Sequence, residues 1–206
     1  MSAAIIYFLF PLSAKIPVST FQENKHFDFA GRYIIRDFDT MRPVSNFLSG
    51  LAGVWGVPMW AFYVNRGQGI TSFGIQSKDG AISKFYSAEK AYQLTPFTGF
   101  RTFIKGNREG KIWDHAPFDQ IVNENQAENI ERNMHVGMNE MEIVEEESAL
   151  GLRTNILYFT LPDQSFPGLV RRVTISNTEK KSALYVDVFD GLARLLPGGL
   201  GEGSTI

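Results

Sequence analysis

Glycine and proline interrupt this chain at short intervals, and that spacing limits the elements that it can form. The 206 residues include 19 glycines and 9 prolines. The segments between them are mostly of strand length and alternate apolar with polar residues, as in 100–105 and 170–176,. Many short strands with turn signals at roughly ten-residue spacing are typical of a sandwich or barrel. The pattern therefore predicts an all-β fold with few short helices.

Individual strands can be assigned from the same pattern. A short strand is predicted at 33–35, and a hairpin is predicted from 59–64 and 70–75,. Residues 155–161 are apolar at nearly every position, which predicts a strand covered on both sides,. Only 118–133 reads as helical, and its polarity indicates a surface element; a strand remains an alternative there,.

Composition excludes several classes of function. The formal net charge is −2 and the sequence pI is 5.9, whereas a nucleic-acid surface needs a basic stripe,. Cysteine is absent, so the chain has no disulfide, thiolate zinc site or cysteine nucleophile,. A cytoplasmic protein is the expectation that follows.

The two ends of the chain are expected to lie outside the main domain. The apolar run 3–12 is too short to span a bilayer and contains a proline, so no membrane span is predicted,. Secretion or organelle targeting by 1–17 stays an alternative, although no Lys or Arg precedes the run,. We expect an unassigned extension at 1–25, a β domain at 26–194 and the start of a glycine-rich linker at 195–206.

No catalytic or metal-binding residue is predicted. The three histidines have no Gly-x-Ser-x-Gly serine to activate, and His115 is interpreted as a hydrogen-bonded loop residue,. The acidic run 145–147 reads as a solvated loop, and Asp190 reads as part of a turn after a strand,. Asp37 and Asp39 are interpreted as turn residues, so the two carboxylates that glycoside hydrolysis needs are not identified,.

Sugar recognition fits the residues of the predicted hairpin better. Saccharides bind to aromatic faces, with planar amide and guanidinium groups on their hydroxyls. The turn between the two strands carries such groups, and packing of the sheet or satisfaction of the turn is the alternative role for them. The predicted substrate-binding residues are Trp60, Asn65, Arg66, Gln68 and Arg101.

Five segments together resemble the N-terminal region of the inverting glycoside phosphorylases, the cellobiose, chitobiose and β-glucan phosphorylases. They are FAGRYIIRDFD at 29–39 and the segments at 47–82, 91–103, 155–177 and 185–200. The resemblance implies a large antiparallel two-sheet super-sandwich of the galactose mutarotase type. It also implies an (α/α) barrel that carries the catalytic aspartate, and that barrel is absent from this chain.

The resemblance also implies a function. In this family inorganic phosphate is the co-substrate that attacks β-linked oligosaccharides, and the sandwich helps to form a homodimer. The chain is therefore expected to be a non-catalytic carbohydrate-active domain with no other cofactor. The alternative is a stand-alone carbohydrate-binding or assembly module built on the same sandwich.

Overall fold

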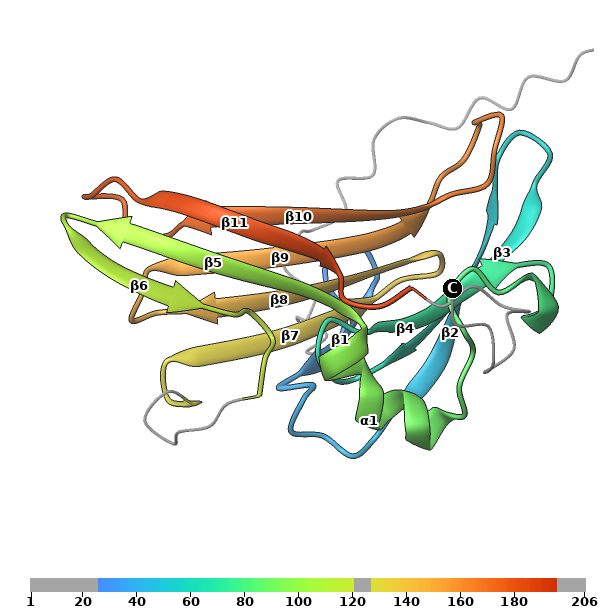
Figure 1. Ribbon diagram of the computed structural model, residues 1–206, viewed down its shortest axis with the longest axis horizontal. Helices are drawn as coiled ribbons and strands as arrows, with labels where there is room; N and C mark the ends of the chain where they lie inside the picture. The colour runs from blue at the N-terminus through green and yellow to red at the C-terminus, as the bar shows by residue number, and fades with distance from the viewer. Residues whose placement is uncertain (1–25, 121–126, 196–206) are drawn as a thin grey trace, which may run out of the picture.

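The computed structural model describes residues 26–120 and 127–195. Its strands form three antiparallel sheets, ordered β1-β7-β8-β9-β10, β11-β5-β6 and β2-β3-β4 (Figure 1). The predicted all-β sandwich class is thus confirmed. The strands are β1 (Tyr33–Arg36), β2 (Ser45–Ala52), β3 (Val57–Val64), β4 (Ile70–Ile75), β5 (Phe100–Arg108), β6 (Lys111–His115), β7 (Ile130–Val136), β8 (Glu140–Glu147), β9 (Leu152–Thr160), β10 (Leu169–Asn177) and β11 (Tyr185–Leu192).

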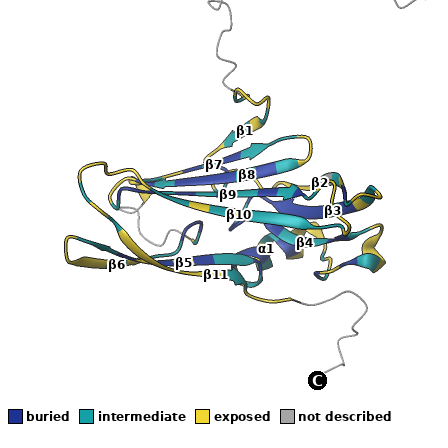
Figure 2. Cartoon of the chain, turned by 90° about the horizontal axis from the view of Figure 1, so that it is seen from above, coloured by how far each residue is buried: buried dark blue, intermediate teal, exposed yellow. Residues whose placement is uncertain are grey.

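The five-stranded sheet and the β11-β5-β6 sheet form two layers (Figure 2). Period-two patterning explains this arrangement, because alternate residues of each strand point to opposite faces. On β5, Thr102, Ile104 and Gly106 are buried while Phe103 and Lys105 are exposed. The main core cluster comprises Phe38, Leu48, Ala61, Tyr63, Ile70, Phe118, Met134, Met141, Ile143, Ile156 and Tyr158.

The predicted hairpin is confirmed as β3 and β4, with β2 paired to the other side of β3. Its turn requires glycine at two positions. Gly67 and Gly69 have φ angles of 55° and 81°, in the region that favours glycine,. A Cβ atom on Gly69 would also lie 2.8 Å from the Met141 side chain. The turn is therefore packed closely against β8.

The helix prediction is wrong in its position. The structure has an α-helix, α1, at Ala88–Thr98, with a short 3₁₀ helix at Lys78–Gly80. Residues 130–133, the end of the expected helical segment, belong to strand β7 (Ile130–Val136), and 121–126 lie outside the described residues. Helix α1 packs against β3, β4 and β5 and buries only Ala91, Thr95 and Pro96. Because these residues are small, the apolar periodicity of a helix is weak in the sequence.

Two loop interpretations are also wrong. Residues 145–147 end strand β8, and Glu145 is only 1 % exposed. Its charge is compatible with burial because cationic partners surround it, as described below. Asp190 lies inside β11 and contacts side chains of β5 and β10. Both errors have the same cause. The partners of Glu145 and Asp190 are distant in the sequence, so the local pattern indicates a charged residue in solvent.

The prediction that the strand at 155–161 is covered on both of its faces is only half correct. It forms most of β9, whose residues alternate between buried and half-buried positions. The predicted segment 1–25 and most of 195–206 lie outside the described residues. No helix in the described part of the chain is long and apolar enough to cross a bilayer.

Candidate binding face

The five predicted site residues lie in different surroundings. Asn65, at the end of β3, is completely buried. Its carbonyl oxygen accepts a hydrogen bond from the Val44 amide at 2.6 Å, and its amide donates to the carbonyls of Phe38 and Arg42. The side chain is therefore used to hold the segment 38–44 against the hairpin.

Gln68 is also buried, with 3 % of its surface exposed. Its amide nitrogen donates to the Thr102 hydroxyl at 3.0 Å, and its carbonyl oxygen accepts from Arg171 at 2.6 Å. The Thr102 hydroxyl donates to Asp190 at 2.6 Å, and Arg171 makes two further bonds to that carboxylate. The Gln68 side chain thus joins the turn to both layers of the sandwich.

Tyr158 of β9 completes this network from beneath. Its hydroxyl donates to the backbone carbonyl of Gln68 at 2.9 Å and accepts from Arg171 at 3.2 Å. Burial raises the pKa of Tyr158 to about 12, although Arg171 acts in the opposite direction,. The phenol therefore stays protonated and acts as a fixed donor.

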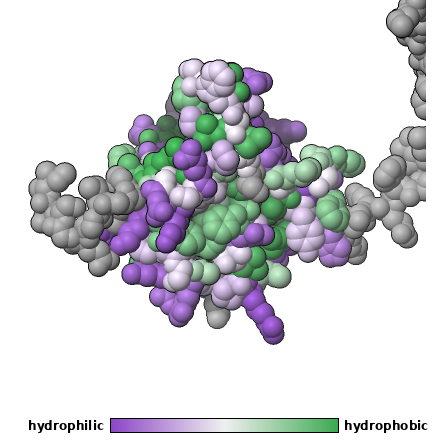
Figure 3. Space-filling model, turned by 90° about the vertical axis from the view of Figure 1, so that its right-hand side faces the viewer, coloured by the Kyte–Doolittle hydropathy of each residue, from purple (hydrophilic) through white to green (hydrophobic). Residues whose placement is uncertain are grey.

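The other three predicted residues lie nearer the surface but apart from one another. The Arg66 guanidinium lies 5.1 Å from the centre of the Tyr92 ring. Trp60 donates to the Ser77 carbonyl and packs edge-on against Phe47 and Phe85. Apolar side chains gather at that end of the molecule (Figure 3), and its exposed residues include Phe47, Leu51, Val54, Trp55 and Phe85.

Arg101 belongs to a different surface, the outer face of the β11-β5-β6 sheet. Its guanidinium lies 4.6 Å from the Phe103 ring centre and donates to Asp119 at 2.6 Å. The sequence therefore placed five residues in one hypothetical site, whereas the structure distributes them over two buried networks and two surfaces. Of the five, only Arg101 lies on the face described next.

The outer face of this sheet consists of alternating aromatic and charged rows. Strand register places Phe189 opposite Phe103, and the two ring centres are 6.4 Å apart. In the next row Asp187 lies opposite Lys105, which lies opposite Asp114 on β6. A further row contains Tyr185 and, across β5, Ile112.

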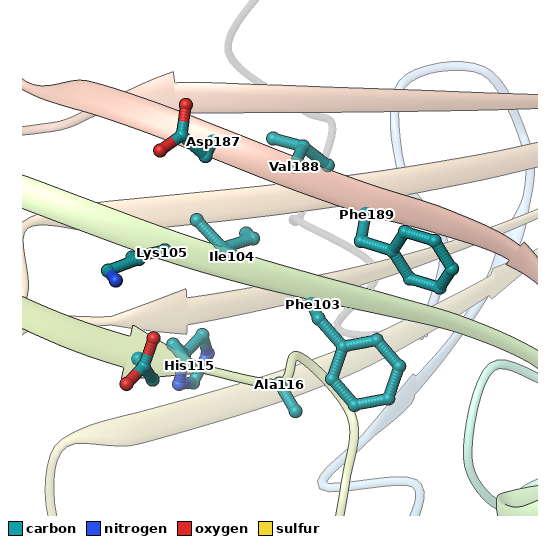
Figure 4. A pocket seen from close by; sticks show the side chains of 9 residues that line it. Phe103, Ile104, Lys105, His115, Ala116, Asp187, Val188 and Phe189 are labelled. Carbon is teal, nitrogen blue, oxygen red and sulfur yellow. The ribbon is translucent and has the colours of Figure 1, made fainter.

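A shallow groove of about 580 Å³ follows the first two of these rows (Figure 4). In the close view the Phe103 and Phe189 rings lie side by side, and Lys105 and Asp187 lie further along the same strands. Phe189 is 76 % exposed and Tyr185 is 74 % exposed. Exposed aromatic faces with adjacent ionised groups suit a ligand that has both C–H surfaces and hydroxyl groups.

A second polar cluster joins the layers behind this face. His115 of β6 lies 2.7 Å from Glu145 of β8, and Arg132 of β7 donates to the same carboxylate at 2.7 Å. The Phe118 backbone amide supplies a third bond to Glu145. Burial opposes ionisation of Glu145, but His115, Arg132 and this amide outweigh it and lower its pKa,. His115 thus pairs with a carboxylate at a strand end, which differs from the loop role expected for it.

The carboxylates of both networks, Asp190 and Glu145, accept hydrogen bonds from protein groups. Within 26–120 and 127–195, no group of three or more His, Asp or Glu side chains could hold a metal ion. The sequence prediction of no metal site concerns the whole chain and stays a prediction.

Sequence reasoning missed Phe189, Tyr185 and Asp187 as surface residues. Their two-residue spacing on one strand was a usable signal, because it places all three on one face,. What was missing is the register that aligns them with Phe103 and Lys105. No protein-family model matches the chain, and no curated protein matches its sequence.

Proposed function

We propose that this chain is a non-catalytic carbohydrate-binding β-sandwich domain of the glycoside-phosphorylase type. In this proposal β-linked gluco-oligosaccharides lie across the outer face of the β11-β5-β6 sheet. Phosphorolysis, with inorganic phosphate as co-substrate, belongs to the (α/α) barrel that the resemblance implies. The observation that carries the proposal is the exposed pair Phe103 and Phe189, flanked by Arg101 and by the charged row of Lys105 and Asp187.

The dimensions of the face support an extended ligand. Phe189 and Tyr185 are four residues apart on one strand, which corresponds to roughly 14 Å at about 3.4 Å per residue. A chain of several sugar rings would contact both aromatic rows, with its hydroxyl groups over the charged row between them. Affinity is therefore expected to increase from a disaccharide to longer oligosaccharides.

Isothermal titration calorimetry with cello- and laminari-oligosaccharides tests the proposal. Phe189→Ala should weaken binding about 10-fold or more, because an aromatic side chain buried by a ligand contributes about 1.5–3 kcal/mol. Phe166→Ala is the matched control, since this exposed phenylalanine lies outside the face, and it should bind as the wild type does. Absence of binding at millimolar sugar, or equal affinity of Phe189→Ala and wild type, would contradict the proposal.

The same titrations separate this face from the site predicted from the sequence. If the sugar binds at the hairpin turn, Arg66→Ala should weaken binding. If it binds at the outer face, Phe189→Ala should weaken binding instead. Incubation of the chain with phosphate and these sugars should yield no glucose 1-phosphate. Turnover would contradict the non-catalytic part of the proposal.

An assembly role is the second candidate, and one observation favours it. Trp55, between β2 and β3, is 86 % exposed and lies beside the exposed Leu51 and Val54. Such an apolar end is a surface suited to association with a second copy of the chain. Sedimentation analysis should then show a dimer that Trp55→Ser dissociates. A monomer at high concentration would exclude this role for the isolated chain.

A further inference from the structure

A separate cleft opens between β6, the start of β7 and the end of β8. Its volume is about 410 Å³, within the range of about 300–1,000 Å³ that is common for small-molecule sites,. Its lining combines aliphatic side chains with amide and ionisable ones. The lining includes Asp119, Gln120, Asn129, Ile130, Arg132, Glu147 and Leu150, together with His115 and Ala116 of the β6 side.

Glu147 is the unusual residue of this cleft. It is 6 % exposed, and one of its carboxyl oxygens accepts a hydrogen bond from the Ala149 backbone amide at 3.0 Å. Within the described residues, no Lys, Arg or His lies at ion-pair distance from it. A buried carboxylate normally has a cationic partner, because burial without one is costly.

The cationic groups of the cleft are already committed to other acids. Arg132 donates to Glu145, to Asp39 at 2.5 Å and to the Asp119 backbone carbonyl. His115 contacts Glu145. Even with a protonated His115, these two cations are balanced by the Glu145 and Asp39 carboxylates. The charge of Glu147 is therefore left without a counter-ion.

The Asp119 carboxylate, which also faces the cleft, is paired with Arg101 at 2.6 Å. The acids around the cleft thus fall into two groups. Those with a protein cation are Glu145, Asp39 and Asp119. Among the described residues of the cleft, Glu147 and Asp114 have no ion pair, and Asp114 is exposed on β6 opposite Lys105, so Glu147 is the buried acid without a cation. Glu147 is therefore the acid for which a ligand would supply the positive charge.

We propose that this cleft binds a small ligand that carries a primary ammonium group, and that the ammonium pairs with the Glu147 carboxylate. An ammonium has three donors, and a charge-assisted hydrogen bond to a carboxylate is stronger than a neutral one. The aliphatic walls of Ile130 and Leu150 suit the carbon skeleton of the ligand, and the Gln120 and Asn129 amides suit its polar substituents. The proposal does not depend on sugar binding at the outer face.

Proton linkage follows from the surroundings of Glu147. Burial raises its pKa, and the nearby Glu145 acts in the same direction, while His115 and Arg132 oppose it,. A bound ammonium favours the ionised carboxylate, so it lowers this pKa and releases a proton in the range where Glu147 is still protonated. Binding is therefore expected to tighten as the pH rises from about 4.5 through the raised pKa of Glu147,.

Titration with D-glucosamine and with D-glucose tests the proposal, because the two sugars differ by an ammonium in place of one hydroxyl. The wild-type chain should bind glucosamine at least about 10-fold more tightly than glucose, and Glu147→Gln should remove this preference. Glu146→Gln is the matched control. Glu146 is the neighbour of Glu147 on β8, but its side chain is 46 % exposed. This control should keep the preference and its pH dependence.

Two outcomes would overturn the proposal. One is equal binding of the two sugars by the wild-type chain, and the other is an unchanged preference in Glu147→Gln. Phe189→Ala separates this cleft from the outer face, because it should weaken oligosaccharide binding and leave the glucosamine preference intact. Failure at one site would thus be distinguishable from failure at the other.

Discussion

At the scale of single residues, the contact between Gly106 and Trp113 limits what the space between the layers can hold. The two residues are register partners on β5 and β6, and the indole ring covers the glycine. A Cβ atom on Gly106 would lie 2.1 Å from the ring. Gly106→Ala should therefore lower the free energy of unfolding by about 1–3 kcal/mol, as overpacking does.

Urea denaturation with Gly191→Ala as the control checks this prediction. Gly191 also lies in a strand of the same sheet, but a Cβ atom there meets nothing within 4 Å. Gly191→Ala should leave the free energy of unfolding unchanged or raise it by up to about 1 kcal/mol. Equal effects of the two substitutions would show that the Trp113 contact does not matter.

Glu145 and Glu147 should respond in opposite ways to the loss of their charge. Glu145→Gln removes one partner of a buried ion pair, so unfolding should become easier by about 3–5 kcal/mol at pH 7,. Burial raises the pKa of Glu147, so its ionisation opposes folding once the pH exceeds the unfolded value of about 4.5,. Glu147→Gln should then stabilise the protein at pH 7, and the gain should disappear near pH 4. Urea titrations of both variants at the two pH values measure these changes.

At the scale of elements, the ion pair between Arg171 and Asp190 joins β10 to β11, the edge strands of two different sheets. Arg171 also donates to Gln68, so Arg171→Met leaves several acceptors without a partner. We expect a loss of about 3–5 kcal/mol in thermal or urea unfolding. Arg153→Met is the control, because its pair with Glu146 is more than 40 % exposed on both sides and should contribute at most about 1 kcal/mol,.

The strands were predictable because period-two patterning is a local property, as 59–64, 70–75 and 100–105 illustrate. Helix α1 was missed because it buries only small residues and contains a proline. The strand at 145–147 was missed because three consecutive glutamates resemble a solvated loop. The burial of Glu145 depends on Arg132 and His115, which the sequence does not place beside it.

The predicted site shows the same limit. A polar turn between two strands indicates that amide groups are present, but it does not indicate which way they point. Asn65 and Gln68 face inward because the carbonyl of Phe38 and the side chains of Thr102 and Arg171 lie there. Only Arg101, identified from its alternating strand, lies on the exposed aromatic face.

At the scale of the whole molecule, carboxylates with lowered pKa values determine the response to acid. Burial opposes ionisation of Asp28, but hydrogen bonds from Arg32 outweigh it and hold its pKa at about 2, below its usual 3.8. Such a group stabilises the fold above its unfolded pKa, and the contribution is lost as the pH falls through the folded value. Stability should therefore decrease from about pH 4.5 downward, as the contributions of Glu145 and Asp28 are lost.

Acid titrations followed by circular dichroism check this prediction. In Asp28→Asn the decrease between about pH 4 and pH 2 should become shallower, because the variant no longer loses this contribution. Asp163→Asn is a control, since this exposed residue between β9 and β10 makes no side-chain hydrogen bond or ion pair with the described residues. If stability decreases with falling pH in the same way in the two variants, Asp28 does not have this role.

The network around Gln68 also has a consequence for the order of folding. Gln68 and Arg171 are 103 residues apart in the chain, and Thr102 and Asp190 are 88 apart. Contacts of such long range close large loops, so they slow folding and form late. During synthesis the Gln68 carbonyl oxygen has to wait for its partner until Arg171 of β10 has left the ribosome, and the bonds of Arg171 and Thr102 to Asp190 have to wait for β11. The nascent chain is most exposed to aggregation and to chaperones during this interval.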